Sequence, residues 1–207
     1  MKSISIVDYE CGNVFSLKNA INKYNPNVSI TYDKDKLLES DIIFLPGVGS
    51  FPAAMKDLNQ KGIDENFFKD LVSKNKTLVG ICLGFQLLFS YSNEFHKTKG
   101  LNLIKGEINS IFELSKIKTK KTNMGWLDVK ANKYTVFFKD LDRKYFFFAH
   151  SYCLKDFKNI DNMEILKSKF LDVEFISCIK NKNIIGFQFH PEKSGKFGLE
   201  CIKRIVI

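Results

Sequence analysis

The sequence predicts an α/β fold: a mostly parallel sheet with helices on both faces, which continues as an antiparallel extension in the second half of the chain. Short apolar strands alternate with amphipathic helices over residues 3–91, whereas strand-like runs with few helices between them dominate residues 101–189. A Gly-x-Cys-x-Gly segment at residues 80–84 joins an apolar strand to an apolar helix through a sharp turn.

In the first half, each strand is a short apolar run, and the helices have apolar residues three or four positions apart, as at Val14, Leu17 and Ile21. Asp64 is a suitable N-cap for the helix that it begins. We expect strands at Ser3–Asp8, Val28–Thr31, Asp41–Leu45 and Thr77–Ile81, and helices at Val14–Tyr24, Lys34–Glu39, Phe51–Gln60, Asp64–Lys74 and Gln86–Tyr91.

The second half reads mainly as strands, and no Pro-, Gly- or Ser-rich linker separates it from the first. We therefore expect a single domain, residues 1–207, in which these strands extend the same sheet. The expected strands are Leu101–Phe112, Trp126–Val129, Tyr145–Phe148, Val173–Ile179 and Ile184–Phe189, and a helix follows at Lys196–Ile205.

Composition excludes several classes of protein. The first residues form a strand and not a signal peptide, and no apolar run reaches the roughly 18–20 residues that span a bilayer, so we expect a soluble, cytoplasmic chain without a membrane partner. Five cysteines without a CxxC pair predict no disulfide framework, and three scattered histidines predict no metal site. We expect no cofactor.

The net charge of +9 raises the question of nucleic-acid binding. The lysines, however, are spread over the whole chain, and the densest run, Lys116–Lys121, is typical of a solvated loop. We therefore expect no nucleic-acid partner; an anionic substrate or an acidic protein surface remains open.

Cys82 is the first candidate catalytic residue. It occupies the apex of the Gly-x-Cys-x-Gly turn, where strain marks functional residues and the N-terminus of the following helix favours a thiolate. Ligands of parallel sheets bind beyond the carboxyl ends of the strands, and Cys82 follows such an end. A buried structural cysteine in a Gly-rich turn would give the same local pattern.

His190 and Glu192 are candidate partners of this thiol. Pro191 forces His190 into an extended conformation, and Glu192, two positions on in an extended segment, points the same way and can orient the ring. A nucleophilic thiolate needs such an imidazole and carboxylate, so the three side chains supply a catalytic triad. The glycine-rich segment Leu45–Phe51 offers backbone N–H groups for an oxyanion hole, together with the N–H of Leu83.

Six motifs in order along the chain carry a family resemblance. They are Asp8–Asn13 (DYECGN), Pro46–Met55 (PGVGSFPAAM), Gly80–Gln86 (GICLGFQ), Asn123–Trp126 (NMGW), Phe148–Tyr152 (FAHSY) and Phe187–Gly195 (FQFHPEKSG). Together they resemble the class I, triad-type glutamine amidotransferases, and more narrowly the glutaminase subunits of imidazole glycerol phosphate synthases from histidine biosynthesis. The resemblance covers essentially the whole chain and implies a flavodoxin-like fold.

The resemblance implies a role for each matching residue. Cys82 would attack the side-chain amide of L-glutamine to give a thioester and ammonia, with His190 moving the proton and Glu192 orienting it. The implied oxyanion hole consists of Val48 or Gly49 and Leu83. The implied glutamine-binding residues are Gln86, Glu94, His150, Ser151 and Tyr152, with Glu94 near the α-ammonium group.

The resemblance also implies a protein partner, a (β/α)8 barrel cyclase that forms a heterodimer with the chain and receives ammonia through a closed channel. The positions that match its interface are Asn13, Trp126, Tyr152 and Lys193. It further implies little glutaminase activity without the barrel, whose binding would remodel the Pro46–Ser50 loop.

Some residues depart from the family pattern; none belongs to the triad, and several lie near the expected partner face. Asn123 stands where histidine is usual, Thr122 where proline is common, and Cys11 replaces a small residue or proline. These departures leave open a paralogue that supplies ammonia to another synthase, such as one that amidates a surface sugar. A stand-alone cysteine hydrolase and a non-catalytic regulatory partner also remain open.

Overall fold

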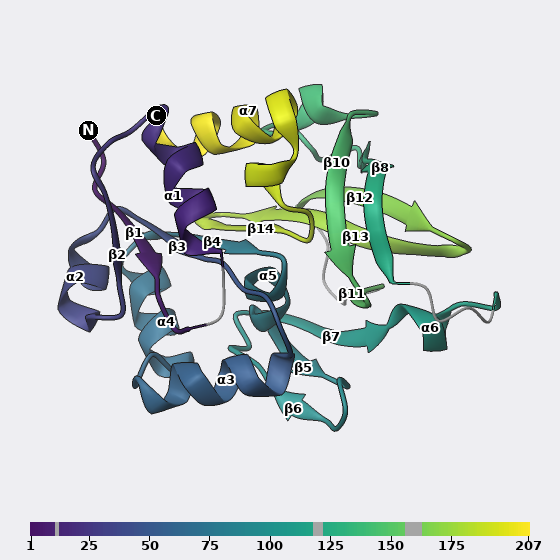
Figure 1. Cartoon of the computed structure of the whole chain (residues 1–207), viewed down its shortest axis with the longest axis horizontal. Helices are drawn as coiled ribbons and strands as arrows, with labels where there is room; N and C mark the ends of the chain where they lie inside the picture. The colour runs from purple at the N-terminus through teal and green to yellow at the C-terminus, as the bar shows by residue number, and fades with distance from the viewer. Residues whose placement is uncertain (11–12, 118–121, 156–162) are drawn as a thin grey trace.

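The structure, a computed structural model, describes residues 1–10, 13–117, 122–155 and 163–207 (Figure 1). Cys11 and residues 118–121 of the lysine-rich run lie outside the described residues.

The main sheet contains eight strands in the described ranges, in the order β2-β1-β3-β4-β14-β13-β12-β9. The strands from β2 to β14 run parallel, and β13, β12 and β9 add antiparallel pairs at one side, which confirms the predicted extension. The bounds are Ile4–Val7 (β1), Val28–Thr31 (β2), Ile42–Leu45 (β3), Thr77–Ile81 (β4), Lys130–Ala131 (β9), Glu164–Phe170 (β12), Val173–Asn181 (β13) and Ile184–Phe187 (β14).

Helices cover both faces of this sheet, as predicted, and each face has its own apolar core. In Figure 1, α1 and α7 lie above the sheet, and α3 and α4 lie below it. The helices are Val14–Asn22 (α1), Lys34–Glu39 (α2), Phe51–Gln60 (α3), Glu65–Ser73 (α4), Leu83–Leu87 (α5), Ile111–Leu114 (α6) and Gly195–Val206 (α7), with 3-10 turns at Lys139–Leu141 (η1) and Pro191–Lys193 (η2). Asp64 caps α4 as predicted, since its carboxylate accepts from the N–H of Phe67 at 3.0 Å.

The second half is more divided than the sequence predicted, because part of it leaves the main sheet. One separate sheet pairs β8 (Asn123–Asp128) with β10 (Tyr145–His150). Another has the order β11-β7-β5-β6, with bounds Tyr152–Leu154, Ile104–Ser110, Phe89–Ser92 and Thr98–Lys99. The strands β6, β9, β11 and β12 were not predicted.

The predicted helix over Gln86–Tyr91 is wrong beyond its first residues. Helix α5 ends at Leu87, and β5 begins at Phe89. The carbonyls of Leu87 and Leu88 accept from the N–H groups of Leu101 and Leu103 at 2.8 and 2.9 Å, so a distant segment takes over their hydrogen bonds. A short apolar run does not by itself distinguish a helix from a strand.

The strand register brings three loops to one edge. Leu45 of β3 pairs with Gly80 of β4, and Ile81 pairs with Phe187 of β14. Because these strands are parallel, the residues that follow them meet beyond their carboxyl ends, where α/β sheets bind ligands.

Candidate active site

Cys82 sits at a strained turn between β4 and α5, with φ of 54° and ψ of −108°. A non-glycine residue in such a conformation costs on the order of 1–3 kcal/mol and persists only where its surroundings enforce it. Here the N–H of Cys82 donates to the carbonyl of Phe187 at 2.7 Å. A Cβ on Gly84 would overlap the backbone carbonyl of Leu45, and one on Gly80 would lie 2.8 Å from the carbonyl oxygen of Gly84. The two glycines therefore allow the close approach that the turn requires.

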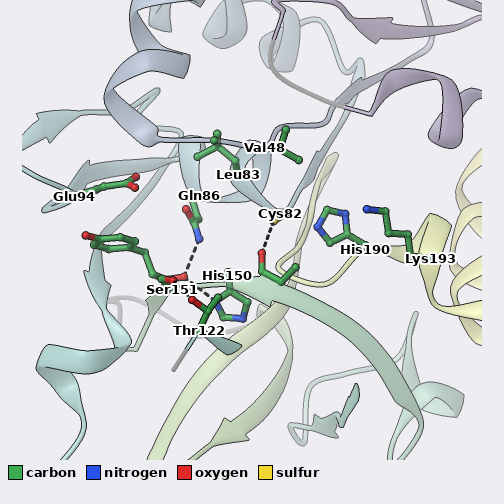
Figure 2. A pocket seen from close by; sticks show the side chains of 13 residues that line it. Val48, Cys82, Leu83, Gln86, Glu94, Thr122, His150, Ser151, His190 and Lys193 are labelled. Carbon is green, nitrogen blue, oxygen red and sulfur yellow. Dashed lines mark hydrogen bonds between the residues drawn. The ribbon is translucent and has the colours of Figure 1, made fainter. Parts of the chain in front are cut away.

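A pocket of about 390 Å³ opens over this turn (Figure 2). Its lining residues are Val48, Gly49, Cys82, Leu83, Gln86, Glu94, Thr122, Ala149, His150, Ser151, Tyr152, His190 and Lys193. In Figure 2, Cys82, His190 and Lys193 lie at one end of the pocket, and Glu94 lies at the other. The pocket is therefore elongated from the thiol toward a carboxylate.

The backbone of His190 is held from two sides. Its N–H donates to the carbonyl of Phe147 at 2.9 Å, and its own carbonyl accepts from the hydroxyl of Ser194 at 2.6 Å. The same hydroxyl accepts from the N–H of Phe147 at 2.9 Å. The backbone of His190 is extended, with φ of −96° and ψ of 96°, as predicted from the proline that follows it.

The imidazole of His190 lies between a thiol and a carboxylate. Nδ1 is 2.8 Å from Oε1 of Glu192, which leaves Nε2 as the ring nitrogen available to Cys82. Burial lowers the pKa of His190, but hydrogen bonds with Cys82 and Glu192 outweigh burial and raise this pKa to about 10. The Cys82 thiol itself points Sγ at the carbonyl of Ala149, 3.7 Å away. The site thus favours an imidazolium beside the sulfur.

Glu192 reaches His190 in a different way from the one predicted. It does not lie in an extended segment, because Pro191–Lys193 forms the 3-10 turn η2. The turn folds the Glu192 side chain back onto the ring, where it is 5% exposed and lies behind His190, outside the pocket lining.

The loop Pro46–Ser50 forms another wall of the pocket, next to Cys82. The hydroxyl of Tyr9 donates to the carbonyl of Pro46 at 2.7 Å, and a Cβ on Gly47 would overlap that hydroxyl. Farther along, Gly49 has φ of +100°, a conformation that glycine adopts without penalty, and Val48 is 46% exposed.

Gln86 lines the pocket and is held in one orientation. Its Nε2 lies 2.8 Å from the carbonyl of Tyr152, an acceptor, so this atom is the donor. The atom of Gln188 that lies 3.0 Å from the same nitrogen must then be an acceptor, and it is Oε1. With both of its N–H groups engaged, Gln86 can offer a ligand only its carbonyl oxygen.

His150 continues this buried hydrogen-bond network. Its Nδ1 is 2.8 Å from the carbonyl of Tyr152 and therefore carries the proton. Burial lowers the pKa of His150 to about 4, so the ring is neutral, and Nε2 accepts from Nδ2 of Asn123 at 2.8 Å. Asn123, one of the departures from the family pattern, thus donates to the ring nitrogen that the Tyr152 carbonyl leaves without a proton.

Glu94 reaches into the far end of the pocket from the turn after β5. Its Oε2 accepts from the N–H of Phe51, the first residue of α3, at 2.7 Å. Burial raises the pKa of Glu94, although the bond from Phe51 opposes this shift.

The remaining sequence-predicted residues fall into two groups. Ser151, Tyr152 and Lys193 line the pocket. Asn13 and Trp126 do not: Asn13 caps α1 through Ser16, and Trp126 is 52% exposed and contacts the ring of Phe147 edge to face.

Sequence reasoning missed several residues that hold the site in place, above all Tyr9, Gln188 and Ser194. Gln188 carried a usable signal, because it is a polar side chain between Phe187 and Phe189 in an otherwise apolar strand end. In the described ranges, no group of three His, Cys, Asp or Glu side chains is arranged to hold a metal ion. Within the same ranges, no helix is both long and apolar enough to cross a membrane.

Comparisons with known proteins agree on the family. The family model "Glutamine amidotransferase class-I" matches residues 5–207. The imidazole glycerol phosphate synthase subunit HisH of Listeria monocytogenes is 36% identical over 200 residues, which cover 97% of this chain and 93% of that protein. The HisH subunit of Oceanobacillus iheyensis is 38% identical over 204 residues, covering 97% and 96%.

Solved structures show the same fold. A glutamine amidotransferase crystal structure superposes with a TM-score of 0.72 at 15% identity, covering 98% of each chain. The structure of PurLQS from Thermotoga maritima gives 0.71 at 21% identity, covering 100% of this chain and 98% of that one. The chain belongs to the class I glutamine amidotransferases and, among them, to the family of the imidazole glycerol phosphate synthase subunit HisH.

Proposed function

We propose that the chain is the glutaminase subunit of an imidazole glycerol phosphate synthase, which hydrolyses L-glutamine and passes the ammonia to a cyclase subunit. The observation that carries this proposal is the pocket itself: a thiol beside a raised-pKa imidazole at one end and a buried carboxylate at the other. The full-length similarity to HisH subunits supports the choice of pathway. Histidine biosynthesis in the cytoplasm is the proposed setting.

In the proposed reaction, the sulfur of Cys82 attacks the amide carbon of glutamine, and the C–N bond breaks after His190 gives its proton to the leaving nitrogen. Ammonia leaves, and a glutamyl thioester remains. His190 then takes a proton from water, which attacks the thioester, and glutamate and the free thiol are released. Glu192 holds the ring through Nδ1 during both steps.

The other pocket residues bind and polarise the substrate in this proposal. N–H groups of Val48 or Gly49 and of Leu83 stabilise the oxyanion. The carbonyl oxygen of Gln86 accepts from the substrate, and Glu94 receives its α-ammonium group. His150, Ser151 and Tyr152 complete the binding site through their backbone and the network described above.

We further propose that a (β/α)8 barrel cyclase binds the face that carries Asn13, Trp126, Tyr152 and Lys193. Trp126 supports this placement because a half-exposed tryptophan is a typical anchor of protein interfaces. Lys193 also lines the pocket, so the partner face and the site of ammonia release adjoin. Because free ammonia is lost to water, the proposed partner would receive it through a closed channel.

Glutamine hydrolysis by the purified chain, with and without the barrel cyclase and its nucleotide ligand, tests the function. We expect little turnover by the chain alone, a large rise on adding the barrel, and none with Cys82→Ala. Fast turnover without any partner would instead indicate a stand-alone hydrolase. Activation by a different synthase, but not by the cyclase, would indicate the paralogue.

A further inference from the structure

Helix α3 takes its N-terminal cap from a side chain far away in the sequence. Ser50, at the N-cap position, makes no side-chain cap bond. Instead, Oε2 of Glu94, 43 positions along the chain from Phe51, accepts from the Phe51 N–H at 2.7 Å. The cap is therefore a tertiary contact that joins α3 to the turn after β5.

The same carboxylate lines the pocket, and none of the described residues supplies it with a counter-ion. Glu94 is 9% exposed, and no ion pair links it to a basic side chain in the described part of the protein. Apart from the histidines, the basic side chain labelled in the pocket is Lys193, which lies at the end opposite to Glu94 (Figure 2). A buried carboxylate without a cation is costly, so a cation in this end of the pocket would be stabilised.

Phe51 directly follows the loop that carries Val48 and Gly49. At the other end of this loop, the hydroxyl of Tyr9 holds the carbonyl of Pro46. The loop is thus fastened at both ends, by Tyr9 and by Glu94, while Val48 and Gly49 between them face the pocket near Cys82.

We propose that Glu94 is a positioning residue that couples the ammonium group of the bound substrate to the loop Pro46–Ser50. One carboxylate oxygen holds the Phe51 N–H, and the other receives the cation. The ammonium group on the second oxygen fixes the position of the carboxylate, and a fixed carboxylate holds the N–H of Phe51 in one place. Substrate binding therefore tightens the end of the loop that presents Val48 and Gly49 to the reacting amide. This inference rests on glutamine as the substrate.

Two substitutions separate the effect of the hydrogen bond to the Phe51 N–H, which anchors the loop, from the effect of the negative charge of Glu94. Glu94→Gln keeps an acceptor for the Phe51 N–H but loses the charge, whereas Glu94→Ala loses both. Asp64→Ala is the matched control, since Asp64 caps α4 with the same kind of bond, to Phe67 at 3.0 Å, and does not line the pocket.

Hydrogen exchange of the full chain without ligand tests the anchor independently of activity. We expect the Phe51 amide to exchange roughly tenfold or more faster in Glu94→Ala, as the loss of a bond to a carboxylate predicts, and to stay protected in Glu94→Gln and Asp64→Ala. Equal protection of the Phe51 amide in wild type and Glu94→Ala would refute the claim that Glu94 anchors this end of the loop.

The coupling is tested on the Cys82→Ala protein, which lacks the nucleophile and therefore cannot consume bound glutamine. Saturating L-glutamine should slow exchange of the Phe51 amide in this protein, and should not do so once Glu94→Gln is added. No effect of glutamine, or the same effect in both proteins, would overturn the coupling.

Steady-state kinetics of the complex with the barrel cyclase then tests the effect on catalysis. Both Glu94 variants should raise KM, but kcat should be roughly tenfold lower in Glu94→Ala than in Glu94→Gln. Identical kcat values would mean that Glu94 only binds the ammonium group, and would refute the positioning role. If wild type hydrolyses no glutamine, the proposed function fails, while the exchange of Phe51 still decides whether Glu94 anchors the loop.

Discussion

Acid should destabilise this protein through His150, a buried and neutral histidine. The residue is 6% exposed, and burial lowers its pKa from 6.5 to about 4, against the opposing effect of the hydrogen bond to the Tyr152 carbonyl. Between these two pKa values the unfolded chain binds one more proton than the folded chain, so stability falls as pH decreases. The loss begins near pH 6.5 and is complete near pH 4.

The size of this effect follows from the two pKa values. A difference of about 2.5 pH units corresponds to about 3 kcal/mol, of which about 2 kcal/mol is lost between pH 7 and pH 4.5. This is a large share of the roughly 5–15 kcal/mol that stabilises a typical domain.

Urea denaturation at a series of pH values between 4.5 and 7 measures the loss. His150→Gln is the control, because it keeps a polar amide at this position without a titrating group. We expect the free energy of unfolding of wild type to fall by about 2 kcal/mol more than that of His150→Gln over this range. Equal losses in the two proteins would refute the reasoning.

Three further predictions concern other parts of the site. The raised pKa of His190 predicts the opposite dependence: its contribution to stability is complete below pH 6.5 and is lost as pH rises toward 10. In denaturation experiments, the free energy of unfolding of His190→Asn should therefore fall less over this range than that of wild type. Gln188→Met should raise KM for glutamine about tenfold, because Gln86 becomes free to rotate. Gln188→Glu keeps an acceptor for Gln86 and should therefore raise KM less than Gln188→Met does. Gly84→Ala should lower the free energy of unfolding, measured by thermal denaturation, by about 3 kcal/mol, because its Cβ meets the backbone of Leu45. Gly195→Ala, at φ +59° with free space around the Cβ, should lower it by only about 1 kcal/mol.

Local patterns predicted those elements whose hydrogen bonds are local. The cap at Asp64 is an example, since donor and acceptor lie three residues apart on the chain. The end of α5 was predicted wrongly because the carbonyls of Leu87 and Leu88 bind Leu101 and Leu103, which no local pattern reveals. The apolar run after Gln86 is compatible with either outcome.

The same limit applies to the site. A strand that ends in His190-Pro191 indicated an extended histidine, and the structure has one. The contact with Glu192 was expected for the wrong reason, since η2 and not an extended segment brings the carboxylate to Nδ1. The orientation of Gln86 could not be predicted at all, because it depends on a carbonyl of Tyr152 and a side chain of Gln188.

By itself, the sequence determined the sharp turn at Cys82, the parallel strands that lead to it and the side chains available for acyl transfer. These depend on glycine sterics and on the spacing of apolar residues, which act over a few positions. Only the tertiary structure decided that Glu94 caps α3 beside the Pro46–Ser50 loop and that the Tyr152 carbonyl sets the tautomer of His150. Buried polar groups take whichever partners packing brings within reach, and that choice depends on how the whole chain folds.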